Sequence, residues 1–494
     1  MSRRTAIGAM SVGAIGVGAA AGAIVDRRLG EPTRPPSGSG AVATVAGWAA
    51  RRGNRYHIGH RGSGDVYPEH SIEGYRAVVA AGIECIEISV GMTSDGTLIC
   101  MHDATYDRTT TLSGTVASLP STVLRGGRLD VPQLGPAWAA EPVPRVPYLL
   151  DVLRELGGKV VMCIEAKNDD AYPAMIAAIE TAGLKDSVII KGFYSSSRLP
   201  QARAAGYPVF GYFGAETDIT LERIAALAKT LAPATDCIVL PASGASGLLN
   251  SQFVTAAVGT GIPVWIYAAH RRSDAAHFFD LGCRGIVGSS APYIASDRPI
   301  ATADTWASGA IAPGEMTRDP SSATYAPAWS GPELHLAAKG TQHFLTLGHF
   351  GPVRSAAGSY TVEVEACWPA LPSSAADNLT IAFGRNDDSY YEHRLGRGNG
   401  YHAILRADGR LELYRHLDGH PDGVQLGVSV ATTPASPGQW IPLRLQVTPA
   451  AITWTRTDAA GTVTSSDSTT RGGYLHIGRS STDGEAAFRK LRLS

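Results

Sequence analysis

Two histidines and a set of carboxylates stand at the ends of short apolar segments in the first half of the chain. Residues 56–60, 85–90, 98–102 and 159–167 are rich in β-forming side chains, yet each carries a polar residue where a buried strand would have another aliphatic one. These polar residues are His60, Glu87, His102, Glu165 and Lys167. A single such residue is most often a satisfied core or surface group, but four segments sharing the feature indicate one active site.

A turn signal joins two of these segments. The tetrapeptide Thr-Ser-Asp-Gly at residues 93–96 is typical of a hairpin between two strands. With the turn centred on its second and third residues, Glu87 is expected opposite His102. Because side chains alternate along a strand, Ser89 shares a face with Glu87. The predicted hairpin therefore brings an imidazole and a carboxylate together.

Motifs at the strand ends follow one another in a distinctive order. They are His60-Arg61-Gly62, Pro68-Glu69-His70-Ser71, residues 82–87, residues 93–96, His102-Asp103, Arg108-Thr109-Thr110, Glu165-Ala166-Lys167, residues 146–153 and residues 263–267. Cations, carboxylates and imidazoles so placed suit the binding of a divalent cation and a phosphate. In order and spacing the motifs resemble the glycerophosphodiester phosphodiesterase family, relatives of the phosphoinositide-specific phospholipase C barrel. The resemblance covers roughly residues 55–295.

The resemblance implies a role for each matching residue. Phosphodiester cleavage needs a base for the attacking hydroxyl, an acid for the leaving alkoxide and positive charge for the phosphoryl oxygens. Oxygen ligands favour a hard cation, Ca²⁺ or Mg²⁺, over zinc. The implied roles are His60 and His102 as the general acid/base pair, Arg61 and Lys167 as phosphate ligands, Glu87 and Glu165 as metal ligands, and Glu69 as a metal-side or orienting carboxylate. Trp265 and Tyr267, on a late strand, are expected to line the substrate site.

One position departs from the family pattern. Relatives carry Glu-x-Asp on the second strand, whereas this chain has Glu87-Ile88-Ser89. Losing one anionic ligand weakens cation binding, although the hydroxyl of Ser89 can still fill a coordination position. Two hypotheses from different classes follow. One is a working enzyme with a looser metal site, and the other is a weakened barrel that acts as a glycan- or phosphate-binding protein.

Composition and patterning divide the chain into five parts. The chain has 494 residues, 44% of them hydrophobic and 18% charged, and its net charge of −1 gives no electrostatic case for nucleic acid. Residues 1–25 resemble a twin-arginine export signal, so the protein is expected to be secreted or at the cell surface. Residues 26–45 are a predicted linker. Residues 46–302 form a predicted (β/α)8 TIM barrel with an insertion at 104–145 that shapes access to the site.

The last part of the chain predicts an all-β domain. Residues 303–335 are a predicted linker, and residues 336–494 alternate as in an antiparallel sandwich of the jelly-roll, concanavalin or laminin-G style. A glycan is the candidate ligand of this domain. Its candidate stacking residues are Tyr390, Tyr391, His393, His416 and Trp440, although strand aromatics are more often core.

The cysteines and the substrate complete the expectations. Most of the six cysteines lie in apolar strand segments and are expected to be buried thiols, with a Cys85–Cys100 bridge as the alternative.

The expected function is that of a secreted, metal-dependent phosphodiesterase that releases glycerol 3-phosphate and an alcohol. Its substrate is a small or polymeric phosphodiester, so glycerol-phosphate cell-wall polymers (teichoic acid) stay open as an alternative.

Overall fold

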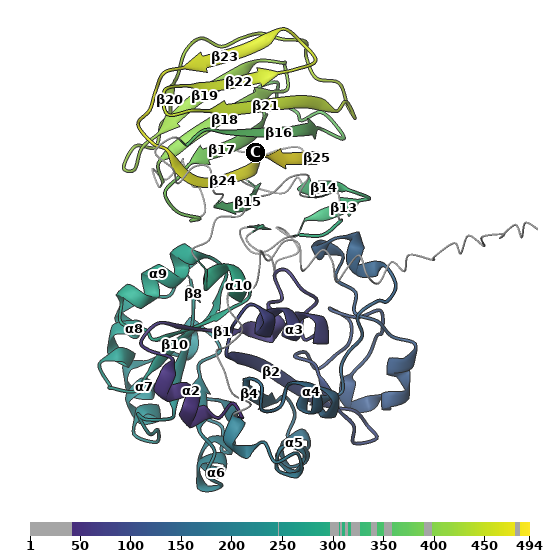
Figure 1. Cartoon of the computed structure of the whole chain (residues 1–494), viewed down its shortest axis with the longest axis vertical. Coiled ribbons are helices and arrows are strands. Elements are labelled where there is room, and N and C mark those ends of the chain that lie inside the picture. Colours follow the sequence, from purple (N-terminus) through teal and green to yellow (C-terminus); the bar gives the residue numbers. More distant parts are fainter. Residues whose placement is uncertain are drawn as a thin grey trace, which may run out of the picture.

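The computed structural model describes most of the chain after residue 41. The described residues are 42–245, 247–296, 306, 309–311, 315–317, 327–336, 343–349, 358–389, 398–479 and 485–494. The predicted export signal and most of the first predicted linker lie outside them. In this described part, no helix combines the length and the apolar character that a membrane span requires. Figure 1 shows a helix-covered barrel and, beyond it, a domain built of strands.

Eight parallel strands close the barrel. Strand β1 pairs with β11 on one side, with Gly59 opposite Gly288, and with β2 on the other, with Gly59 opposite Ile86, so the eight strands form a closed barrel. The strands are β1 (Tyr56–Gly59), β2 (Cys85–Met92), β4 (Val161–Ala166), β5 (Val188–Phe193), β6 (Val209–Tyr212), β7 (Cys237–Pro241), β10 (Val264–Ala269) and β11 (Gly285–Gly288). The predicted TIM barrel is confirmed.

Helices cover the barrel between the strands. They are α3 (Ile72–Ala80), α4 (Leu149–Leu156), α5 (Ala171–Thr181), α6 (Arg198–Ala204), α7 (Leu221–Ala228), α8 (Ser251–Val258), α9 (Arg272–Asp280) and α10 (Ala291–Ile294). An earlier helix, α2 (Val45–Arg51), precedes β1, and its Trp48 ring meets Tyr56 edge-on at 5.3 Å and Trp265 at 5.9 Å. Because Tyr56 and Trp265 stand at the start of their strands, this aromatic cluster closes the end of the barrel opposite the active site.

The hairpin between β2 and β3 (Leu98–Cys100) forms, but its register differs by one residue from the prediction. Val90 lies opposite Cys100 and Met92 opposite Leu98, and the turn is closed by Thr93 and Thr97. The loop therefore has three residues and ends on Gly96 at φ 79°, instead of the two-residue turn assumed from Asp-Gly. Glu87 is consequently not the partner of His102 across the hairpin.

The predicted insertion at 104–145 contains no long element. It consists of loops and four short 3₁₀ turns: η2 (Val116–Ser118), η3 (Ser121–Arg125), η4 (Pro132–Leu134) and η5 (Pro136–Ala139). A small apolar cluster around Tyr106, Val116 and Leu129 holds it together and packs on Ile99 of β3. A short hairpin, β8 (Ser243–Gly244) with β9 (Gly247–Leu248), stands at the same mouth of the barrel.

The C-terminal domain consists of two seven-stranded antiparallel sheets packed as a sandwich. One sheet runs β12 (Met316–Thr317), β15 (His343–His349), β24 (Gly472–Arg479), β17 (Asn378–Gly384), β18 (Gly400–Arg406), β19 (Leu411–His416) and β20 (Val424–Gln425). The other runs β13 (Ala328–Ser330), β14 (Glu333–Leu336), β25 (Ala486–Leu493), β16 (Tyr360–Cys367), β21 (Ile441–Val447), β22 (Ile452–Arg456) and β23 (Gly461–Ser465). Because β14 pairs with β25, the sandwich begins before residue 336, where the predicted linker was expected to end.

A buried aspartate fixes the sandwich to the barrel. The carboxylate of Asp388 accepts the backbone N–H groups of Arg272 at 2.8 Å and Ser273 at 2.9 Å, and the hydroxyl of Tyr293 at 2.7 Å. Its side chain is fully buried. The two N–H groups open helix α9, whose positive N-terminal dipole favours a carboxylate. A loop of the sandwich is thereby held beside the mouth of the barrel.

The predicted stacking surface of the sandwich has only two described members. Tyr390, Tyr391 and His393 lie outside the described residues. His416 is buried with its ring 4.6 Å from that of His402, and the Trp440 ring is covered by the Arg489 guanidinium at 4.1 Å. Neither is a free stacking platform. All six cysteines are buried free thiols, and the neighbour of Cys85 is Cys163 on β4 rather than Cys100.

Candidate active site

The barrel interior changes from apolar to polar along each strand. Its lower layer contains Cys85, Cys163, Ile189 and Phe210, which pack together around the barrel axis. Two residues farther along the same strands, the inward-facing positions become Glu87, Glu165, Lys191 and Tyr212. The strand period of two therefore builds a charged layer directly above the hydrophobic one, at the carboxyl ends of the strands where TIM barrels place their sites.

An ammonium group joins the two inner carboxylates. Lys191 Nζ lies 2.6 Å from Glu87 Oε1 and 3.0 Å from Glu165 Oε2, with only 6% of its side chain exposed. Burial alone lowers the pKa of Lys191, but Glu165 and Glu87 outweigh burial and raise it. Burial likewise raises the pKa of Glu87, yet Lys191 and the nearby histidines hold it well below its usual value. All three groups are therefore charged at neutral pH.

His60 occupies the turn that follows β1. Its Nδ1 lies 2.9 Å from the hydroxyl of Ser289, which follows β11, while its buried Nε2 has no hydrogen-bond partner among the described residues. Burial lowers the pKa of His60 well below 6.5, and the charges of Arg61 and Lys191 lower it further. The turn holds Arg61 at φ 51°, and the Arg61 backbone N–H donates to Glu87 Oε2 at 3.2 Å. His60 is thus a neutral imidazole able to accept a proton.

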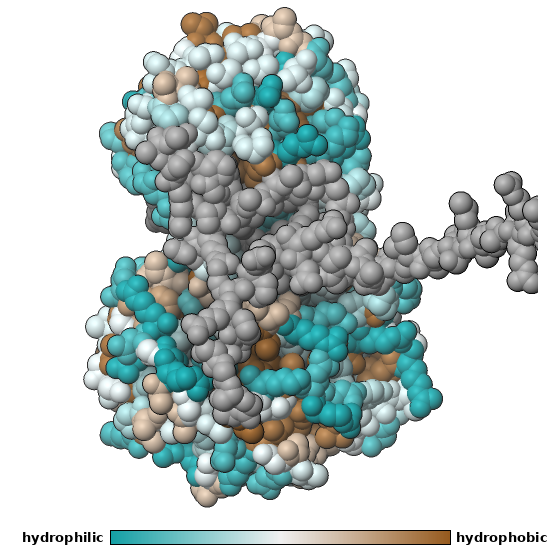
Figure 2. All heavy atoms as spheres, viewed as in Figure 1, coloured by the Kyte–Doolittle hydropathy of each residue, from teal (hydrophilic) through white to brown (hydrophobic). Residues whose placement is uncertain are grey.

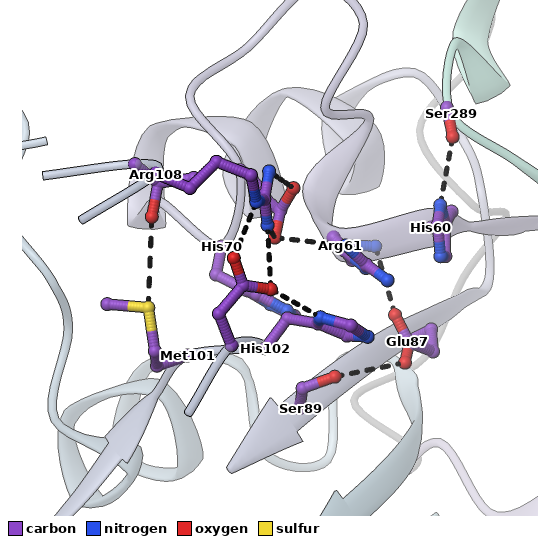
Figure 3. A network of polar contacts seen from close by, with 12 residues as sticks. His60, Arg61, His70, Glu87, Ser89, Met101, His102, Arg108 and Ser289 are labelled. Atoms are coloured by element: carbon purple, nitrogen blue, oxygen red, sulfur yellow. Dashed lines mark hydrogen bonds and ion pairs between the residues drawn. The ribbon is translucent and has the colours of Figure 1, made fainter. Parts of the chain in front are cut away.

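The second histidine is oriented by an acidic neighbour. His102 Nδ1 lies 2.8 Å from Asp103 Oδ1, which directs Nε2 toward the cleft. Burial lowers the pKa of His102, and the hydrogen bond to Asp103 opposes that effect. Arg108 binds both Asp103 and Glu69, and Arg61 also binds Glu69 at 3.2 Å. Figure 3 shows Arg61 and Glu87 between the two histidines, with Arg108 above His102 in this view.

A cleft of about 1000 Å³ opens over these residues. Its floor includes both histidines, Arg61 and Tyr267, and one wall comes from the insertion, through residues such as Arg108 and Gln133. The opposite wall belongs to the sandwich and is formed by Arg385, Asp387, Ser389, Gly398, Asn399 and Asp418. Figure 2 shows hydrophilic and hydrophobic residues intermixed on the visible face of the barrel. Two domains and the insertion therefore surround one polar site.

The structure brings most of the predicted site residues together and corrects one. His60, Arg61, Glu69, His102 and Tyr267 line the cleft. Glu87, Ser89, Glu165 and Lys167 lie below and beside it, with Lys167 Nζ 3.1 Å from Glu165. Trp265 is misassigned. It is 1% exposed and belongs to the aromatic cluster at the closed end of the barrel, because it is the second residue of β10 and not the last.

Sequence reasoning missed four residues of the site. Lys191 interrupts an otherwise apolar strand, and that irregularity was a usable signal. Asp103 and Arg108 were part of matched motifs but received no role. Ser289 gave no local signal, because its hydroxyl meets His60 only through the β1–β11 pairing that closes the barrel.

The predicted four-ligand metal site is not formed by these residues. Within the described ranges, no group of three or more His, Cys, Asp or Glu side chains is arranged to hold a metal ion. Glu69 is bound to two arginines, and the hydroxyl of Ser89 lies 3.4 Å from Glu87. The space between Glu87 and Glu165 holds the ammonium of Lys191. Since a cation cannot share that space with an ammonium, this donor set does not fit Ca²⁺ or Mg²⁺.

Comparison with known sequences connects the site with one family. Residues 60–288 match the glycerophosphoryl diester phosphodiesterase family. A glycerophosphodiester phosphodiesterase of Bacillus subtilis (strain 168) is 34% identical over 128 residues, covering 24% of this chain and 42% of that protein. One from Caldanaerobacter subterraneus subsp. tengcongensis is 33% identical over 143 residues, covering 28% and 57%. The chain thus spans about half the length of these curated relatives.

Solved structures include similar proteins. A phosphodiesterase of Oleispira antarctica, solved in complex with the product sn-glycerol-3-phosphate, is 20% identical. The similarity covers 49% of this chain and 95% of that one, with a TM-score of 0.41. A putative glycerophosphoryl diester phosphodiesterase of Silicibacter pomeroyi is 18% identical, with coverages of 53% and 93% and a TM-score of 0.39.

Proposed function

Residues 60–288 belong to the glycerophosphoryl diester phosphodiesterase family, and on that premise we propose that the protein hydrolyses glycerophosphodiesters to glycerol 3-phosphate and an alcohol. The observation that carries the proposal is the pair of histidines that line one cleft together with Arg61. His60 presents a buried Nε2 that has no partner among the described residues, and His102 is held by Asp103 at the same cleft. One imidazole accepts and the other donates a proton, as phosphodiester cleavage requires.

The surroundings of each histidine assign its direction of proton transfer. The low pKa of His60, caused by burial and by neighbouring cations, keeps its imidazole unprotonated at neutral pH, so His60 takes the proton of the attacking water. Burial sets the pKa of His102 below its usual value, but Asp103 stabilises the imidazolium form against that effect, and His102 is therefore assigned to protonate the leaving alkoxide. Arg61 and Lys167 neutralise the phosphoryl oxygens. No step of this mechanism passes through a metal ion.

The proposal is tested by incubating the purified chain with glycerophosphodiesters and measuring glycerol 3-phosphate enzymatically. Assays run with chelator, with Ca²⁺ and with Mg²⁺, so that an unmet metal requirement is not mistaken for inactivity. Release of glycerol 3-phosphate in any of these conditions supports the activity. Its absence in all of them, on small diesters and on glycerol-phosphate polymers, would favour the binding-protein hypothesis.

The Asp103–His102 contact gives a pH-dependent prediction. Asp103→Asn removes the carboxylate that raises the pKa of His102, so His102 loses its proton at lower pH. We expect kcat to fall by about 10²-fold and the alkaline limb of the pH–rate profile to move to lower pH. The profile between pH 5 and pH 9 checks this result. Asp151→Asn, an exposed helical residue outside the cleft, is the matched control.

A second candidate substrate follows from the wall built by the sandwich. A cleft of this volume, with polar groups contributed by two domains, exceeds the needs of a glycerophosphate with a small alcohol. Repeating glycerol-phosphate or glycan-bearing diesters would use the additional surface, in keeping with the proposed export of the chain. The sandwich then contacts the substrate's second half at the cleft.

The anchor at Asp388 tests whether the sandwich wall takes part. Asp388→Ala leaves two N–H groups of α9 and a buried hydroxyl unsatisfied, a cost of about 2–3 kcal/mol to domain docking. We expect KM for polymeric diesters to rise several-fold while kcat on a small diester changes little. Steady-state kinetics on both substrates, with the exposed Asp422→Ala as control, checks the prediction. Equal effects on both substrates would contradict a role of the wall in substrate choice.

A further inference from the structure

We propose that the ammonium group of Lys191 replaces the divalent cation of this barrel, so that the chain's phosphodiesterase works without a bound metal. The inference rests on the proposed function and specifies how its charge is arranged. It also departs from the family, whose members generally depend on a divalent metal.

The position of Lys191 is the first argument. Ile164 pairs with Ile190 across β4 and β5, so the next residues, Glu165 and Lys191, stand side by side at one level of the barrel. The Nζ atom contacts both Glu87 and Glu165 within hydrogen-bond distance. It also lies 5.0 Å from the centre of the Tyr212 ring. Two carboxylates and an aromatic ring thus surround the ammonium, which fills the space between the carboxylates.

The charge balance is the second argument. Glu87 and Glu165 carry two negative charges, and Lys191 and Lys167 carry two positive ones, so the inner layer is neutral without a metal. A divalent ion beside Lys191 would repel it across a few ångströms of low dielectric. Expelling the lysine would leave a buried ammonium without its partners, which costs several kcal/mol. A metal is therefore disfavoured either beside the lysine or in its place.

Ser89 gives the third argument. A carboxylate at this position would add a negative charge level with Glu165, its partner across β2 and β4. The serine removes that charge, and the lysine supplies a positive one, so both residues reduce the need for a cation. Either residue alone could be explained by packing. Because Ser89 and Lys191 both lie beside Glu87 and Glu165, one explanation covers both: together they compensate for the absence of a divalent cation.

Lys191 acts through its neighbours and is a positioning residue. The ion pair with Lys191 stabilises the ionised form of Glu87. It also holds that carboxylate where it accepts the Arg61 backbone N–H. That contact fixes the turn carrying both His60 and Arg61. Positive charge for the phosphoryl oxygens then comes from Arg61, which lines the cleft, and from Lys167, whose side chain is more exposed than that of Lys191.

Calorimetric titration of the metal-stripped full chain with CaCl₂ and MgCl₂ tests the proposal, paired with the glycerol 3-phosphate assay. We expect no stoichiometric binding at millimolar cation and activity within twofold with and without EDTA. Binding of one equivalent that Glu87→Gln or Glu165→Gln abolishes would overturn the proposal, as would a more than tenfold loss of activity on chelation that either cation restores. The wild-type titration requires no variant to fold.

Two variants make the test specific. Lys191→Gln is expected to lower kcat at least 30-fold, whereas Lys229→Gln on the surface leaves it unchanged. Ser89→Asp combined with Lys191→Gln restores a third carboxylate, and this double variant is expected to bind one Ca²⁺ that the wild type does not. Failure of a folded double variant to bind Ca²⁺ would count against the replacement. Absence of glycerol 3-phosphate release in every condition would sink the proposed function instead, while the titration would still decide the cation question.

Discussion

Replacing either histidine of the cleft with alanine lowers kcat on glycerophosphodiesters by about 10³-fold, within the range that general acid–base catalysis contributes. His60→Ala removes the imidazole whose Nε2 lacks a partner in the described part of the chain, and His102→Ala removes the one that Asp103 orients. Because each acts on a different proton, neither can substitute for the other. Glycerol 3-phosphate release under single-turnover conditions measures the loss directly.

The two variants should differ in how pH affects what activity remains. Without His60 the acid limb of the profile disappears, because no base is left to protonate. Without His102 the alkaline limb disappears for the complementary reason. His420→Ala, an exposed histidine of the sandwich, is the matched control and should retain full activity. Full activity in either cleft variant would contradict the two-histidine mechanism.

The second large effect concerns stability. Glu87→Ala removes a fully buried carboxylate from Lys191 and from the Arg61 backbone N–H, and we expect a loss of about 3 kcal/mol in the free energy of unfolding. For a barrel of this size such a loss lowers Tm by roughly 5–10 °C. Differential scanning fluorimetry and urea unfolding measure it. Glu222→Gln, exposed in the first turn of α7, should change stability by less than about 0.5 kcal/mol.

The same ion pair makes stability depend on pH with a defined sign. The folded-state pKa of Glu87 lies well below its unfolded value because Lys191 outweighs the effect of burial. The stabilisation is therefore complete above about pH 4.5 and is lost as the pH falls toward the folded pKa. The wild type should lose more stability than Glu87→Gln between roughly pH 5 and pH 3. Parallel pH curves for the two proteins would contradict the ion pair.

Residues of both domains line the cleft. The Asp388 anchor and the wall from Arg385 to Asp418 place the sandwich beside the reacting groups, so the domain is part of the site's boundary. A tethered module would act only by raising the local concentration of substrate. Here a loss of docking is expected to change the choice of substrate, as the Asp388→Ala variant tests.

Local patterns along the chain are sufficient to predict the barrel and the sandwich, and they point to several residues that the structure brings together at the candidate site. The alternation of apolar strands with helical segments is a local feature that predicts the barrel. The polar residues at the strand ends are a second local feature, and they identify His60, His102, Glu87, Glu165 and Lys167. The β2–β3 hairpin is also predicted correctly, but its register depends on whether the loop has two or three residues. Asp-Gly alone does not fix that length, because Gly96 adopts positive φ in either kind of turn.

Contacts between segments that are distant in the sequence determine the surroundings of the site residues. In the sequence, Lys191 is only a lysine within an apolar strand. The β4–β5 register is what places its Nζ between two glutamates. Trp265 belongs to the closed end of the barrel because of its height on β10, which the strand pairing sets. Ser289 meets His60 through barrel closure, and the sandwich reaches the cleft through Asp388. Each of these contacts joins segments far apart in the chain, and a one-dimensional pattern holds no information about their separation in space.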